Sequence, residues 1–106
     1  MGESSVDVQM IAVWDMEKYV QEYELHIIDL REKSEYLKGH IPGAVSIPYE
    51  ENLCCFLSMP IENKYLLYCD RGNTSLLLGK QMGECGYCVY TLSGGYLAFE
   101  KYRSKE

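Results

Sequence analysis

The sequence predicts an α/β domain built on a central, mainly parallel sheet of five strands with helices on both faces. Short apolar runs typical of strands alternate with helical patterns along the whole chain. The run Leu25-His26-Ile27-Ile28 has the composition of a buried strand, as parallel sheets require. The chain has 106 residues, of which 47% are hydrophobic, enough for one core. We therefore expect one domain over residues 1–106, with residues 1–7 frayed at the N-terminus.

The first half of the chain contains three of the expected strands. Asp15 can cap a helix whose apolar residues recur at helical spacing up to Tyr23. Gly39 can close a short second helix, and Pro42-Gly43 predicts a turn before the third strand, which Pro48 ends. The expected strands are 10–13, 25–28 and 45–47, and the expected helices are 16–23 and 32–37.

The second half of the chain repeats the alternation. Pro60 ends a helix that carries Leu53, Phe56 and Leu57, and Gly94-Gly95 turns the chain into a last helix. The expected strands are 64–68 and 89–92, and the helix between them is 75–84. Within that helix, Leu78, Met82 and Cys85 fall on one stripe, while Gly79 and Gly83 weaken the helix but allow close packing.

Charge and composition exclude several classes of function. The formal net charge of −6 argues against nucleic-acid binding, which requires a basic face. No apolar run approaches the ~20 residues of a membrane helix, so we expect no membrane partner. The first residues lack the basic and apolar segments of a signal peptide, so we expect a cytoplasmic protein. There, the five cysteines are expected to be free thiols.

Cys69 is the strongest candidate for chemistry. It stands where the apolar strand 64–68 ends, and a short polar loop with Gly72 separates it from a helix that begins near Ser75. The N–H groups of such a loop and the positive end of the helix both favour a thiolate, which is the nucleophilic form of cysteine. Ligands of parallel α/β sheets also bind at the carboxyl ends of strands, where Cys69 lies.

Three segments together resemble the single-domain rhodaneses, a family of sulfurtransferases. The first is Asp29-Leu30-Arg31-Glu32 followed by Glu35-Tyr36 and Gly39-His40-Ile41-Pro42-Gly43-Ala44. The second is the loop from Cys69 to Ser75, and the third is Leu92-Ser93-Gly94-Gly95-Tyr96 with Phe99. These segments cover about nine-tenths of the chain in the family's order and spacing, so the resemblance implies a rhodanese-like fold.

The resemblance implies sulfur transfer through Cys69. The thiolate takes the outer sulfur of a small anionic donor such as thiosulfate, and a thiol, cyanide or a protein thiol then accepts it. The backbone N–H groups of residues 71–75 are expected to stabilise the anionic sulfur. The expected substrate-binding residues are Asp70, Arg71, Gly72, Asn73, Thr74 and Ser75. No metal or organic cofactor is implied.

Other motif residues are expected to support the fold. By resemblance, Asp29 and Arg31 support the loop from beneath, and His40 packs and hydrogen-bonds within its turn instead of acting as a base. Thr74 stands where many family members have Arg, which leaves Arg71 as the cation of the loop, beside the acidic Asp70.

Two rival functions use the same fold. Related phosphatases have a loop one residue longer that ends in an arginine, and this chain lacks that arginine. A non-catalytic binding domain, or a sulfur carrier that serves one partner protein, remains the alternative to a general sulfurtransferase.

The remaining cysteines and His26 are expected to pack in the interior. Cys85-Gly86-Tyr87-Cys88 lies at the end of a helix, whereas a thioredoxin-type pair lies at a helix start. Cys54-Cys55 would be a poor second half of a zinc site. His26 occurs in an apolar strand, so we expect it in the core.

Overall fold

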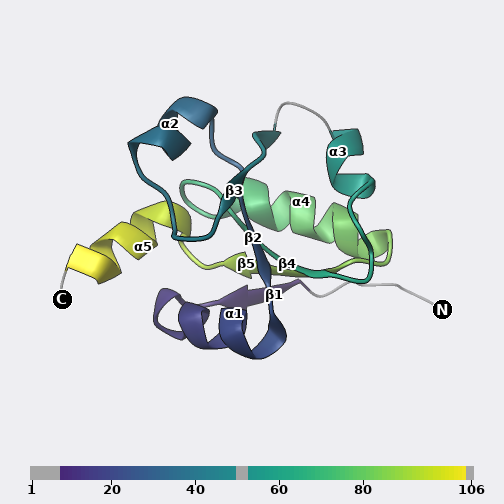
Figure 1. The fold of residues 1–106 in the computed structure, drawn as a ribbon, viewed down its shortest axis with the longest axis horizontal. Helices are drawn as coiled ribbons and strands as arrows, with labels where there is room; N and C mark the ends of the chain where they lie inside the picture. Colours follow the sequence, from purple (N-terminus) through teal and green to yellow (C-terminus); the bar gives the residue numbers. More distant parts are fainter. Residues whose placement is uncertain (1–7, 50–52, 105–106) are drawn as a thin grey trace.

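The computed structural model describes residues 8–49 and 53–104, except for the side chains of Leu53 and Cys54. Its five strands form one sheet in the order β1-β5-β4-β2-β3, with every pair parallel (Figure 1). The strands are β1 (Gln9–Ile11), β2 (His26–Asp29), β3 (Val45–Ser46), β4 (Lys64–Tyr68) and β5 (Cys88–Leu92). The predicted five-stranded α/β fold is confirmed. Residues 1–7, which we expected to be frayed, lie outside the described residues.

The helices follow the predicted alternation. They are the 3-10 helix η1 (Val13–Asp15), α1 (Met16–Tyr23), α2 (Lys33–Lys38), α3 (Leu53–Leu57), α4 (Asn73–Glu84) and α5 (Gly95–Ser104). Helix α4 begins two residues earlier than predicted. Gly72 takes a positive φ of 103° and is the last residue of the loop, so the helix begins at the next residue. Among the described helices, none combines the length and hydropathy needed to cross a membrane.

Both faces of the sheet are covered, as predicted. Strand β4 alternates: Leu66 and Tyr68 face the core beneath α1 and α5, whereas Tyr65 and Leu67 face the core beneath α3 and α4. Both cores are fully enclosed at their centres, since Leu66, Tyr68 and Leu67 are 0% exposed. The carboxyl end of β4, where Cys69 follows, is therefore anchored on both sides.

Helix α4 packs closely on β5, and Gly79 makes this approach possible. A Cβ built on Gly79 would come within 3.1 Å of Val8 Cγ1 and 3.2 Å of Thr91 Cγ2. These distances leave no room for a side chain without movement of a neighbour. The predicted close packing at Gly79 is confirmed.

Four expectations about burial were wrong. His26 is exposed because it faces away from buried Leu25 and Ile27, at the end of β2 that the core beneath α3 and α4 does not cover, and its ring lies 5.7 Å from that of Tyr65. Cys85 leaves the predicted stripe because α4 ends at Glu84, so the chain turns before Cys85 reaches the sheet. Cys85, Cys88 and Cys55 are exposed free thiols and not packing residues. The side chain of Cys54 lies outside the described residues.

Candidate active site

The sulfur of Cys69 is held by the loop that follows β4. The backbone N–H of Gly72 donates to Cys69 Sγ at 3.2 Å, and the N–H of Ser75 donates at 3.4 Å. Ser75 Oγ lies 3.6 Å from the same sulfur. Hydrogen bonds from N–H groups stabilise a negatively charged sulfur more than a neutral thiol. The sulfur is nearly buried, since Cys69 is 7% exposed.

The shape of the loop results from Gly72 and Ser75. The positive φ of Gly72 turns the chain so that its own N–H points back at Cys69 Sγ. Ser75 is fully buried, and its hydroxyl donates to the Gly72 carbonyl at 3.2 Å, which closes the loop. Of the five N–H groups predicted to surround the sulfur, the structure brings those of Gly72 and Ser75 onto it.

Helix α5 anchors the outer side of the loop. The N–H of Tyr96 donates to the Cys69 carbonyl at 2.8 Å, and the N–H of Leu97 donates to the Asp70 carbonyl at 3.1 Å. Gly95 has a φ of +64°, and a Cβ there would overlap the Cys69 carbonyl and lie 2.6 Å from the Asp70 oxygen. The glycine pair at the start of α5 therefore lets this helix touch the backbone of the reactive loop.

Asp29 and Arg31 form a buried ion pair next to the site. Arg31 Nη2 lies 2.7 Å from Asp29 Oδ2, and the two side chains are 3% and 0% exposed. The same Nη2 donates to the Gly39 carbonyl at 2.7 Å, and the guanidinium lies 4.0 Å from the centre of the Tyr96 ring. Burial lowers the pKa of Arg31, but the hydrogen bond and charge of Asp29 outweigh this effect and raise it.

Tyr68 links this ion pair to the core, a role that sequence reasoning missed. Its hydroxyl donates to Asp29 Oδ2 at 2.6 Å and accepts from the Ile41 N–H at 3.1 Å. Burial, and then the hydrogen bond to Asp29, raise the pKa of Tyr68 well above its usual range. The hydroxyl therefore stays protonated and holds the Asp29 carboxylate in place.

His40 lies in the turn after α2. Its Nδ1 is 2.8 Å from the Tyr36 carbonyl, and its ring stacks on the Tyr36 ring with centroids 3.8 Å apart. Tyr36 in turn donates to the Ala44 carbonyl at 2.8 Å. These contacts hold the turn whose Gly39 carbonyl accepts a hydrogen bond from Arg31.

A hollow of about 360 Å³ opens at Cys69. It is lined by Leu30, Arg31, Glu32, Pro48, Tyr49, Cys69, Asp70, Arg71, Asn73 and Thr74. The predicted residues Asp70, Arg71, Asn73 and Thr74 thus share one cavity with the sulfur, while Gly72 and Ser75 hold the sulfur from the loop. Asp70 and Arg71 are exposed, so they are free to face a solute.

Sequence reasoning missed Glu32, Pro48 and Tyr49 as lining residues. Glu32 follows the end of β2, and Pro48-Tyr49 follow the end of β3. The rule that pointed to Cys69, that sites gather at the carboxyl ends of parallel strands, applies equally to these residues.

The model of the rhodanese-like domain matches residues 14–102 of this chain. The chain belongs to the rhodanese-like family. A tRNA sulfurtransferase of Desulfurococcus amylolyticus is 35% identical over 69 residues, which is 65% of this chain but only 14% of that protein. YtwF of Bacillus subtilis, whose name assigns it provisionally to the sulfurtransferases, is 31% identical over 84 residues, with 79% of this chain and 82% of the relative covered.

Solved structures agree with this rhodanese-like fold. A rhodanese-related protein from Thermoplasma volcanium superposes with a TM-score of 0.80 at 22% identity, covering 89% of this chain and 92% of that one. At this identity the likeness concerns the fold alone. The sequence relatives, in contrast, place the chain among proteins named as sulfurtransferases.

Proposed function

We propose that this protein is a sulfurtransferase that carries sulfane sulfur as a persulfide on Cys69. The Cys69 thiolate attacks the outer sulfur of thiosulfate or a similar donor. A bond forms between Sγ and that sulfur, the S–S bond of thiosulfate breaks, and sulfite leaves with the bonding electron pair. A thiol or cyanide then attacks the outer sulfur, and Sγ departs as the thiolate.

The observation that supports this proposal is the convergence of three groups on one sulfur in a hollow. The N–H groups of Gly72 and Ser75 and the Ser75 hydroxyl lie 3.2–3.6 Å from Cys69 Sγ. The two N–H groups stabilise the thiolate before the attack and when it departs again, whereas the Ser75 hydroxyl donates to the Gly72 carbonyl. The hollow of about 360 Å³ above the sulfur has room for a small donor.

The polar rim gives the donor its orientation. Arg71, Asn73 and Thr74 line the same hollow and offer a guanidinium, an amide and a hydroxyl to the oxygens of an anionic donor. Asp70 opposes the anion from the same rim. The binding of thiosulfate is therefore a balance between neighbouring charges of opposite sign.

The proposal is tested by replacing the nucleophile. In the Cys69→Ser variant, transfer of sulfur from thiosulfate to cyanide should be lost, because serine cannot form the persulfide. Cys85→Ser and Cys88→Ser are matched controls, since both thiols are exposed and lie at the other end of α4. Thiocyanate production by Cys69→Ser at a rate comparable to that of the wild type would refute the mechanism.

A further inference from the structure

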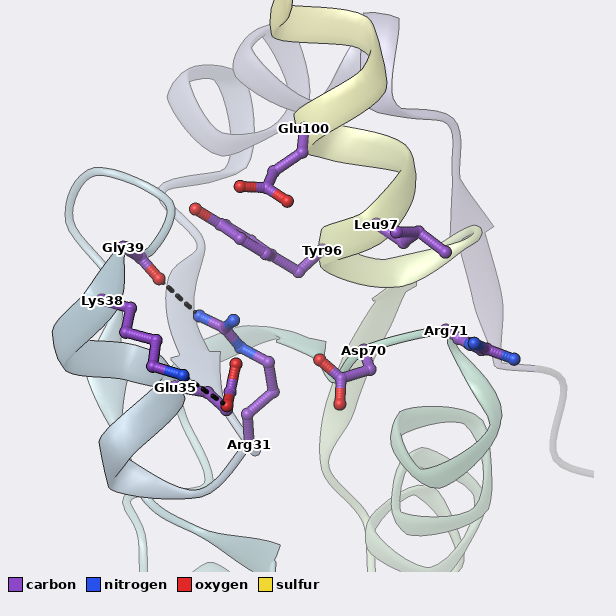
Figure 2. A pocket seen from close by; sticks show the side chains of 9 residues that line it. All are labelled: Arg31, Glu35, Lys38, Gly39, Asp70, Arg71, Tyr96, Leu97 and Glu100. Carbon is purple, nitrogen blue, oxygen red and sulfur yellow. Dashed lines mark hydrogen bonds and ion pairs between the residues drawn. The ribbon is translucent and has the colours of Figure 1, made fainter.

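A second hollow, of about 390 Å³, lies beside the first on the α5 side of the reactive loop (Figure 2). It is lined by Arg31, Glu35, Lys38, Gly39, Asp70, Arg71, Tyr96, Leu97 and Glu100. Arg31, Asp70 and Arg71 belong to both hollows. A molecule that presents a thiol to Cys69 therefore has a second cavity directly beside it.

Three cations and three carboxylates line this second hollow, but some of them are already paired. Arg31 is paired with Asp29 at 2.7 Å, and Lys38 with Glu35 at 3.4 Å. Asp70, Glu100 and the cationic Arg71 form no ion pair with any residue in the ranges 8–49 and 53–104. Two carboxylates are thus available to a ligand.

The directions of the side chains favour a cation. In Figure 2 the Glu100 carboxylate lies beside the Tyr96 ring, and the Asp70 carboxylate points toward Arg31. The Arg71 guanidinium extends away from Tyr96 and Glu100. The lining cation that is not already paired therefore points away from Glu100.

The floor of the hollow is rigid and partly apolar. Tyr96 is buried, with the Arg31 guanidinium 4.0 Å from its ring centre, and Arg31 is itself fixed by Asp29 and Gly39. Leu97 is 46% exposed at the rim. Such a surface suits the alkyl stem of a lysine or arginine, whose charged end then reaches the carboxylates.

We infer that this hollow binds a cationic side chain next to the acceptor cysteine of a polypeptide, which makes Glu100 a specificity-determining residue. The inference rests on the proposed sulfur transfer. In the second half-reaction the acceptor must attack as a thiolate, and a neighbouring ammonium or guanidinium lowers the pKa of that thiol. The same cation offsets the repulsion between the thiolate and the two carboxylates.

The transfer step itself is balanced. The acceptor thiolate attacks the outer sulfur of the Cys69 persulfide, a bond forms between the two sulfurs, and the bond to Cys69 Sγ breaks. The acceptor becomes a persulfide and retains the proton of the outer sulfur, while Cys69 is released as the thiolate. No external oxidant or reductant takes part.

Two matched peptides test the inference. The full-length protein is loaded with thiosulfate, and its sulfur is offered to a pentapeptide whose central cysteine is flanked by two lysines or by two glutamates. Persulfide formed on the peptide is trapped by alkylation and measured by mass spectrometry. At low salt the lysine peptide should accept sulfur about tenfold faster, and the ratio should fall as salt is added.

A pair of variants separates binding from intrinsic thiol reactivity. Glu100→Lys should abolish most of the preference for the lysine peptide. Glu84→Lys, which makes the same change of charge at the far end of α4, should leave it intact. An equal preference in the two variants, or transfer to free cysteine as fast as to the lysine peptide, would overturn the inference while sulfur transfer itself stands. Absence of sulfur on Cys69 after thiosulfate treatment would instead refute the proposed function.

Discussion

At the scale of single residues, opposite charges on the rim of the Cys69 hollow control the binding of the sulfur donor. Arg71 and Asp70 are adjacent and exposed, and both line the hollow. Because thiosulfate is anionic in both the ground and transition states, Arg71→Ala should raise its KM about two- to fivefold with a smaller effect on kcat. Asp70→Asn should lower the KM. Steady-state kinetics at two ionic strengths measure both effects, and an unchanged KM in Arg71→Ala would remove Arg71 from the donor site.

Tyr68 makes stability depend on pH in the alkaline range. The pKa of Tyr68 is raised in the folded state. Just above the unfolded value of about 10, the Tyr68 hydroxyl therefore ionises in the unfolded chain but not in the folded one. The free energy of unfolding should therefore keep the full contribution of Tyr68 below that pH, and it should decrease as the pH rises above it.

The Tyr68→Phe variant isolates this effect. It removes one of the hydrogen bonds to Asp29, which keeps Arg31, and leaves the Ile41 N–H without its partner. The variant should therefore lose about 1–3 kcal/mol at neutral pH, and its stability should fall less steeply above pH ~10. Urea unfolding across this range measures both quantities. The exposed Tyr102→Phe is the control, and an alkaline slope in Tyr68→Phe as steep as in the wild type would contradict the assignment.

At the scale of elements, α5 holds the reactive loop through Gly95. Gly95→Ala adds a Cβ against the carbonyls of Cys69 and Asp70 at a positive φ, so it should destabilise the fold by several kcal/mol and displace the sulfur. Gly43→Ala is a matched control with a φ of +90° and no atom within 4 Å of the new Cβ, and it should lose only about 1 kcal/mol. Thermal unfolding and sulfur transfer measured together test this prediction. Equal losses in the two variants would exclude the close contact as the cause.

Most elements could be predicted because their local signals agree with their tertiary environment. Strand β4 was predicted with its observed bounds, since an uninterrupted apolar run is buried on both faces. The misplaced features lie at element ends. The start of α4 depends on the φ of Gly72, the exposure of Cys85 depends on where α4 ends, and that of His26 depends on how far the core on its face of the sheet extends. Hydrophobic periodicity does not encode these positions.

At the scale of the whole molecule, exposure and thiolate stabilisation, the two properties that govern thiol reactivity, occur at different cysteines. Cys55, Cys85 and Cys88 are exposed, whereas Cys69 is nearly buried but carries the hydrogen bonds that favour a thiolate. Because only the thiolate reacts, Cys69 should be the first of these to react with iodoacetamide near pH ~6. Peptide-resolved labelling over a pH series tests this order. Faster labelling of the exposed cysteines would contradict the activation of Cys69 by its loop.

The candidate site could be predicted where one continuous segment builds it, and not where distant segments meet. The loop from Cys69 to Ser75 is local, and its strand–loop–helix pattern is visible in the sequence. Glu32, Tyr49 and Glu100 reach the two hollows only through the strand order and the placement of α5. Tyr68 was assigned to its strand, but its hydroxyl contact with Asp29, 39 residues away, requires the register of β2 and β4.

The central claim is that Cys69 carries the transferred sulfur. The most direct test is peptide-resolved mass spectrometry of the protein after treatment with thiosulfate and removal of the excess donor. We expect a gain of one sulfur atom on the peptide that contains Cys69, its loss on addition of cyanide, and no gain on the peptides that contain Cys85 or Cys88. An unmodified Cys69 peptide, or sulfur on the exposed cysteines instead, would contradict the account.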